Sequence, residues 1–189
     1  MIDARSVAEL VLGFSDPNDG EALKSRELIL RLLQCAPGAL SRYHFAPGHL
    51  TCSGLVLARD HERLLLVHHR RLDRWLLPGG HVEATDARIR DAARREVIEE
   101  TGAILAPDPG TQALVGMDVH GIPAHGRDPY HLHHDLTFYF EALSDEFHVT
   151  EESRAVAWCA PAGFDTYQLP GNIRRAYARA RRLSPLQGT

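Results

Sequence analysis

The chain has 189 residues, 44% of them hydrophobic and 24% charged, which is typical of a soluble globular protein with one domain. Its formal net charge of −4 gives no basic footprint for nucleic acid, so we do not expect a nucleic-acid partner. The three cysteines are far apart, and neither a signal peptide nor an apolar run long enough to span a bilayer is present. These features favour a cytoplasmic protein with no membrane partner.

Residues 1–48 predict a helical N-terminal extension to the domain. Apolar residues between Val7 and Phe14 have the spacing of one helix, and those between Leu23 and Leu33 suggest a second. Residues 15–20 form a polar loop between them. The extension could pack on the core, form a homodimer or shape a substrate pocket, and the sequence leaves these alternatives open.

The following residues predict a mixed sheet with helices on it. Residues 50–58 and 63–68 are apolar runs that predict a β-hairpin, and residues 64–67 are apolar throughout, as in a strand covered on both faces. Further strands are expected at residues 113–120, 133–143 and 155–159, and a helix at 171–183. The order predicts an α/β/α sandwich, with a core at residues 49–165 and a C-terminal helix and tail at 166–189.

Three carboxylates lie close together just before Gly102. If this segment is helical, Glu96, Glu99 and Glu100 can share one face, where they repel one another and oppose the helix dipole. A hard divalent cation bound by their oxygens would offset this cost, although a solvated acidic helix face is the alternative. A short apolar strand at residues 75–77 and a Gly79–Gly80 turn precede the helix, an order that suits phosphate binding to a cation.

At these residues the chain resembles the Nudix hydrolases. Their box has a glycine, five residues, a glutamate, seven residues, and then Arg-Glu, an aliphatic residue, any residue, Glu-Glu, any residue and glycine. Gly80 opens it here and residues 95–102 close it. Asp86 stands where the first glutamate belongs, eight residues instead of seven separate it from Arg95, and Ala103 replaces a larger aliphatic residue. Asp86 could contact Arg95 or cap the helix, and Glu83 is a possible substitute.

The resemblance implies a metal-dependent pyrophosphohydrolase that acts on a nucleoside diphosphate linked to another moiety, such as a nucleoside triphosphate or a nucleotide sugar. It implies Mg²⁺ or Mn²⁺ held by Glu96, Glu99 and Glu100, with help from the Gly80 carbonyl. A non-catalytic nucleotide-binding or regulatory Nudix domain is the alternative function.

The resemblance also bears on the catalytic groups. A carboxylate must accept a proton from the attacking water, and Glu99, Glu100, Glu151 or Glu152 could do so. Arg95 can pair with Glu99 one turn further on and hold the carboxylates in place.

The strand at residues 131–140 carries the candidates for substrate binding. Alternation puts Leu132, His134, Leu136, Phe138 and Phe140 on a core face, and leaves His131, His133, Asp135, Thr137 and Tyr139 to line a pocket. Five histidines between residues 120 and 134 suggest a metal, but scattered loop histidines plus one buried one are favoured. We expect His133 and Asp135 to face the pocket without binding the catalytic metal. Trp75 or Tyr139 could stack a base, although aromatic residues beside strands are more often core.

Overall fold

A computed structural model describes residues 2–107, 113–151 and 153–184. The described strands form a mixed sheet in the order β3-β2-β1-β6-β5, with β4 paired to β1 and β7 paired to β2. The pair β1·β6 is parallel and the other pairs are antiparallel. The strands are β1 (Gly48–Leu57), β2 (Leu64–His69), β3 (Arg74–Leu76), β4 (Gly79–His81), β5 (Leu114–Ile122), β6 (His131–Glu141) and β7 (Ser153–Cys159).

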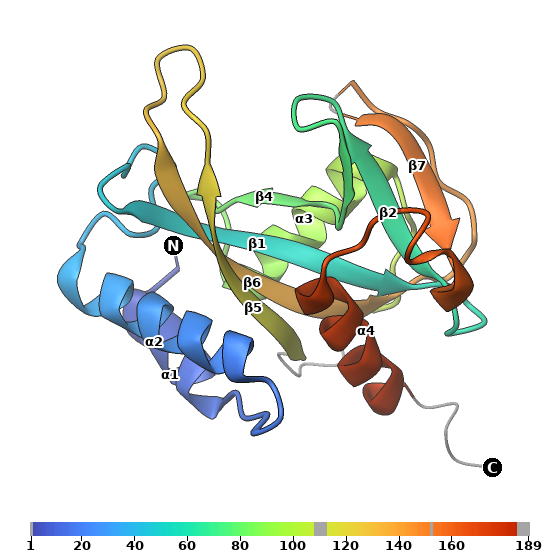
Figure 1. The fold of residues 1–189 in the computed structure, drawn as a ribbon, viewed down its shortest axis with the longest axis horizontal. Helices are drawn as coiled ribbons and strands as arrows, with labels where there is room; N and C mark the ends of the chain where they lie inside the picture. The colour runs from blue at the N-terminus through green and yellow to red at the C-terminus, as the bar shows by residue number, and fades with distance from the viewer. Residues whose placement is uncertain (1, 108–112, 152, 185–189) are drawn as a thin grey trace.

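The helices lie on both sides of this sheet (Figure 1). They are α1 (Ala4–Gly13), α2 (Gly20–Cys35), α3 (Ile89–Thr101) and α4 (Gly171–Leu183), with a short 3₁₀ turn, η1 (Pro161–Gly163). Asp3 and Asp19 cap α1 and α2, since each carboxylate accepts a hydrogen bond from a backbone N–H of the first turn. Among the described helices, none has the length and apolar character needed to cross a bilayer.

Side chains of alternate strand residues enter two separate core clusters. In β2, Leu65 and Val67 pack in a cluster with α3 and the N-terminal helices, whereas Leu64 and Leu66 pack in a second cluster with α4. All four are buried. This period of two confirms a strand covered on both faces and an α/β/α sandwich.

The N-terminal extension packs on the core. Val11 and Ile29 are fully buried in the same cluster as strand and α3 side chains. On α4, Arg179 donates hydrogen bonds to the carboxylates of Asp16 and Asp19 in the loop before α2. One of the three roles left open by the sequence, packing on the core, is therefore confirmed.

Two expectations about individual strands differ from the structure. Residues 79–81 form strand β4 and not a glycine loop, because β4 approaches β1 so closely that a Cβ at Gly79 would lie 2.5 Å from the Cys52 carbonyl oxygen. Tyr139 does not line a pocket. It is 7% exposed in the cluster with α4, and its hydroxyl donates to Glu141 at 2.7 Å.

Candidate metal and catalytic site

The glycine strand β4 lies directly against the acidic face of α3. The Gly79 N–H donates to Glu100 Oε2 at 2.9 Å, and the His81 N–H donates to Glu96 Oε1 at 3.1 Å. A Cβ on Gly80 would lie 2.6 Å from a Glu96 carboxylate oxygen, so a side chain there would displace that carboxylate. The backbone of β4 therefore orients two carboxylates, which lie one helical turn apart on the same face.

Arg95 connects the carboxylates of this region. Its guanidinium donates two hydrogen bonds to Asp86, at 3.2 and 3.1 Å, and one each to Glu96 and Glu99, both at 2.9 Å. A further hydrogen bond goes to the His81 carbonyl at 2.8 Å. Although burial by itself would lower it, these acceptors raise the pKa of Arg95, so the group stays charged.

The contact to Arg95 answers the question left open for Asp86. Asp86 is 6% exposed, and it also accepts the Glu83 N–H at 2.8 Å. It does not cap α3, because Arg88 occupies the N-cap position, where its N–H donates to Asp91. Asp86 thus contacts Arg95 despite its shorter side chain and the extra residue in the box.

The three glutamates of α3 differ in burial. Glu100 is 4% exposed, whereas the Glu99 side chain is 57% exposed and pairs with Arg95. Consecutive residues project about 100° apart around a helix, so the burial of Glu100 turns Glu99 towards solvent. Glu96 and Glu100 therefore accept hydrogen bonds from the glycine strand, whereas the exposed Glu99 is linked to Glu96 through one Arg95 nitrogen.

The donors at this site suit a hard cation. The Glu96 and Glu100 carboxylates and the Gly80 carbonyl are oxygen ligands of the kind that Mg²⁺ and Mn²⁺ prefer. Because Gly80 has no side chain, the backbone of β4 lies close to the Glu96 carboxylate. The residues present therefore fit the divalent cation that the resemblance implies.

A loop covers the C-terminal end of α3. The Thr150 hydroxyl donates to the Glu100 carbonyl at 3.3 Å, and the His148 N–H donates to the Thr101 carbonyl at 2.8 Å. Glu151, an exposed candidate for the catalytic base, directly follows Thr150. The structure therefore places Glu151 in the loop that contacts α3, and Glu152 lies outside the described residues.

Asp135 lies on the α4 side of the sheet, where it is 8% exposed. Its Oδ1 accepts hydrogen bonds from the Thr51 and Ser53 hydroxyls at 2.9 and 3.0 Å, and its Oδ2 accepts one from Thr137 at 3.3 Å. Burial raises the pKa of Asp135 despite these donors. The structure thus puts this residue in a hydroxyl-lined site.

Histidines from separate strands gather beside Asp135. His49 on β1 pairs with His133 on β6 in the parallel register, and its ring lies 5.0 Å from that of His131. The ring of His81 on β4 lies 5.1 Å from that of His49. Burial lowers the pKa of His49 and His81 to about 4 and that of His133 to about 2. The expectation of scattered loop histidines is therefore wrong for this group.

The sequence offered no local signal that His49 would join this group. His49 is 82 residues from His131 in the chain, and only the parallel pairing of β1 with β6 brings the two together. The five histidines between residues 120 and 134 were a partial signal, since His120, His131 and His133 belong to the group and exposed His125 does not.

Trp75 lies at the edge strand β3, on the side of the sheet that carries α4. Its ring makes edge contacts with His68 and Tyr167, at centroid distances of 5.0 and 4.9 Å. It is half-buried and packs against the second core cluster. The structure therefore keeps part of this ring accessible, in contrast to Tyr139.

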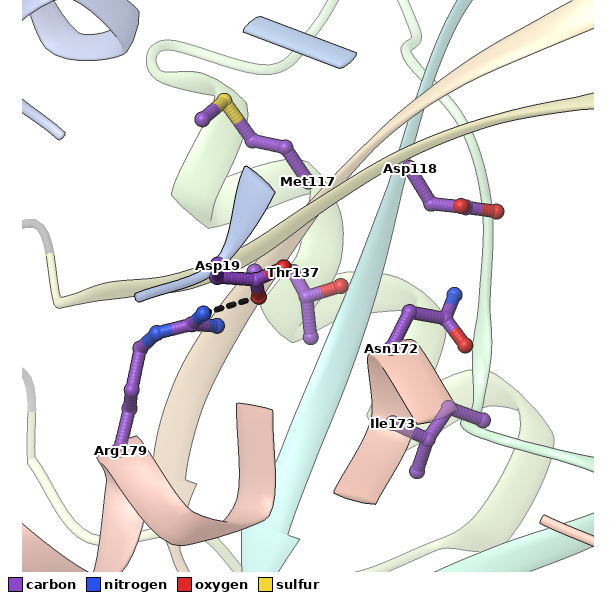
Figure 2. Close-up of a pocket in the computed structure, with 8 residues that line it drawn as sticks. Asp19, Met117, Asp118, Thr137, Asn172, Ile173 and Arg179 are labelled. Carbon is purple, nitrogen blue, oxygen red and sulfur yellow. Dashed lines mark hydrogen bonds and ion pairs between the residues drawn. The ribbon is translucent and has the colours of Figure 1, made fainter. Parts of the chain in front are cut away.

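A small pocket opens between β5, β6 and α4. Figure 2 shows Asp118, Thr137 and Asn172 at its wall, and the Asp19–Arg179 ion pair at its other side. The volume open to the centre of a water molecule is about 10 Å³, which is enough for a single water.

Comparison with known proteins gives the class of this chain. It matches the NUDIX domain family model over residues 48–181. It is 49% identical to m7GpppN-mRNA hydrolase NUDT17 of Danio rerio over 68 residues, which cover 33% of this chain and 22% of that protein. It is 26% identical over 121 residues to the "Putative 8-oxo-dGTP diphosphatase" of Bacillus subtilis (strain 168), which cover 64% of this chain and 73% of that protein.

Solved structures share the fold. A NUDIX family hydrolase from Clostridium perfringens has a TM-score of 0.50 and 19% identity, and the match covers 72% of this chain and 98% of that one. A NUDIX hydrolase from Nitrosomonas europaea has a TM-score of 0.51 and 19% identity, with coverages of 70% and 88%.

The chain therefore belongs to the Nudix hydrolase family. It spans only 22% of the zebrafish relative, and the solved structures support the fold alone.

Proposed function

We propose that this chain is a metal-dependent pyrophosphohydrolase that cleaves a nucleoside diphosphate linked to another moiety, by attack of water at phosphorus. The observation that carries the proposal is the pair of carboxylates, Glu96 and Glu100, that the backbone N–H groups of β4 hold on one face of α3. Two oriented carboxylates beside a glycine carbonyl form the kind of oxygen site that binds a cation and, through it, a diphosphate.

Glu96, Glu100 and the Gly80 carbonyl would hold Mg²⁺ or Mn²⁺, and Glu99 would join them by turning away from Arg95. When bound, the cation neutralises charge on the diphosphate and makes water more acidic. Arg95 holds the carboxylates in position through its hydrogen bonds to Asp86, Glu96 and Glu99.

Proton transfer needs a carboxylate within hydrogen-bond reach of the attacking water. On α3 the candidates are Glu99 and Glu100, which would also bind the metal. Glu151 is the candidate from the loop over the end of α3.

The rest of the substrate would lie on the α4 side of the sheet. His133 and Asp135 on β6 pair with His49 and Thr51 on β1, and Thr51 pairs in turn with His81, which directly follows Gly80. This row of paired residues therefore starts at His81, directly beside Gly80 of the proposed phosphate site. Trp75 on the same side offers a ring face for a nucleobase.

The names of the relatives guide the choice of substrates to test. One is described as an mRNA cap hydrolase and the other as an 8-oxo-dGTP diphosphatase. A panel should therefore contain 8-oxo-dGTP, ordinary nucleoside triphosphates, nucleotide sugars and a cap dinucleotide, all of which are nucleoside diphosphates with a further group attached.

The deciding experiment incubates the purified chain with Mg²⁺ or Mn²⁺ and this panel, and measures released phosphate with and without added phosphatase. We expect metal-dependent turnover of at least one compound, and its loss in Glu100→Gln with the circular dichroism spectrum retained. Nucleotide binding without turnover across the panel would instead establish a non-catalytic binding domain. Unchanged turnover in Glu100→Gln would refute the proposed site.

A further inference from the structure

Three histidine rings converge at one point on the α4 side of the sheet. One ring nitrogen each from His49, His131 and His133 lies within 4.8 Å of the other two. Of the side chains that the structure describes, this is the group of three potential metal ligands that meets that distance. The group does not include the box glutamates.

The hydrogen bonds of two rings determine which nitrogen faces this point. His49 Nδ1 lies 3.1 Å from the His44 carbonyl, and His131 Nδ1 lies 2.8 Å from the Pro129 carbonyl. A carbonyl can only accept, so each Nδ1 carries the hydrogen and each Nε2 presents a lone pair. Such a carbonyl partner is the usual way in which proteins orient a metal-binding histidine.

His49 supplies an independent observation. The residue is 1% exposed, and its Nε2 is buried without a hydrogen-bond partner among the described residues. A buried nitrogen that lacks a partner costs free energy, and a ligand at the centre of the three rings would remove that cost.

The spacing of the nitrogens is close to that of a tetrahedral site. Two nitrogens bound to one Zn²⁺ at about 2.1 Å lie about 3.4 Å apart. The Nε2 atoms of His131 and His133 are 3.3 Å apart. A modest movement of the third ring would complete the geometry, since its nitrogen is within 4.8 Å of both.

We propose that His49, His131 and His133 form a second metal site that binds one Zn²⁺ ion, separate from the carboxylate site on α3. Neutral imidazoles suit Zn²⁺ and related transition metals, whereas Mg²⁺ prefers oxygen ligands. The hydrogen that His133 Nε2 shares with His131 moves to Nδ1 when the ion binds. Three protein ligands leave a fourth position for water or a substrate oxygen.

The proposed zinc site lies close to the Nudix box. The ring of His81 lies 5.1 Å from that of His49 and 5.4 Å from that of His133, and its backbone holds Glu96 and Arg95. A dication bound to the three histidines would therefore lie beside the strand that carries the proposed phosphate site.

The test measures metal binding and needs no substrate. The full chain, without any affinity tag, is stripped with a chelator and titrated with Zn²⁺ against a chromophoric zinc indicator, in saturating Mg²⁺ to occupy oxygen sites. We expect one tightly bound Zn²⁺ per chain. His133→Asn, a change at a half-buried ring, should weaken binding by at least about 100-fold, as expected for loss of a direct ligand.

Matched variants separate this site from the others. His125→Asn removes an exposed histidine near the tip of the same β5–β6 hairpin and should bind Zn²⁺ as the unmodified chain does. Glu100→Gln should also retain Zn²⁺, because it changes only the carboxylate site. Bound Co²⁺ should show the intense visible bands of a four-coordinate ion, and His133→Asn should lose them.

Three results would overturn the proposal: no Zn²⁺ uptake in the presence of Mg²⁺, equal affinity in His133→Asn, or loss of Zn²⁺ in Glu100→Gln alone. The first would mean that the rings enclose only water. None of these outcomes depends on hydrolysis, so the failure of the proposed function would leave this test intact.

Discussion

Replacing Asp86 with alanine tests whether this residue acts through Arg95 on the stability of the box. Asp86 is 6% exposed and accepts two hydrogen bonds from Arg95 and one from the Glu83 N–H. Alanine removes all three hydrogen bonds and leaves a small cavity. We therefore expect the variant to be less stable, with a smaller effect on turnover.

The structure gives the size of the effect. Hydrogen bonds to a charged group contribute about 1.5–3 kcal/mol each, but these are not additive, and Arg95 keeps three other acceptors. Its side chain is also 20% exposed, so water can partly replace Asp86. We expect a loss of roughly 2–4 kcal/mol in the free energy of unfolding. For a chain of this size that lowers the melting temperature by roughly 5–15 °C.

The assay is urea unfolding followed by circular dichroism, together with the melting temperature. Asp165→Ala is a matched control, because that carboxylate also pairs with an arginine but is 91% exposed, and such pairs contribute about 0–1 kcal/mol. Equal losses in the two variants would refute the reasoning. So would a large loss of turnover in Asp86→Ala with an unchanged melting temperature, since the residue would then act on catalysis directly.

Three further predictions concern the glycines and the ion pair of Arg179. Gly80→Ala places a Cβ 2.6 Å from the facing carboxylate of α3, so we expect weaker binding of Mn²⁺, measured by its electron paramagnetic resonance signal. Gly102→Ala should lower the free energy of unfolding by at least about 1 kcal/mol in urea, because its φ is +62° and a Cβ would overlap His148. Burial alone would raise the pKa of Asp19, but hydrogen bonds from α2 and Arg179 lower it. We therefore expect Asp19→Asn to be less stable than the unmodified chain at neutral pH. This difference in stability should vanish as the pH falls through the lowered pKa, below about pH 4.

Two of these predictions have a control within the chain. Gly13→Ala adds a Cβ with nothing within 4 Å, so its stability should not fall; a fall equal to that of Gly102→Ala would contradict the steric argument. Asn at residue 19 still caps α2, which isolates the charge. A stability difference that persists in acid would show that the carboxylate charge is not the cause. Unchanged Mn²⁺ affinity in Gly80→Ala would remove Gly80 from the proposed metal site.

Local periodicity predicted most of the fold. The strand β2 was recognisable because four consecutive buried apolar residues need cover on both faces, and α4 was found at residues 171–183, where its bounds lie. The short strand β4 was missed because two glycines signal a turn in sequence, and only their fit against β1 makes them a strand. Tyr139 was misplaced because alternation defines two faces without saying that α4 covers the second.

The candidate site was predictable where it is local in sequence. The pairing of Arg95 with Glu99 follows from helical spacing, and the structure shows it at 2.9 Å. The outward direction of Glu99 depends on which helix face the sheet buries. The contact of His49 with His131 and His133 depends on strand order and register, which a single sequence does not reveal.

The ion pairs between α4 and the loop before α2 make the N-terminal extension an integral part of the folded domain. Arg179 is 8% exposed and is held by Asp16 and Asp19, more than 150 residues earlier in the chain. A protein trimmed to the family-matched residues 48–181 would keep this buried guanidinium but lose both carboxylates, and it would expose the apolar surface that α1 and α2 cover. Loss of the extension would thus weaken the helix at the opposite end of the chain, and a trimmed domain would tend to aggregate.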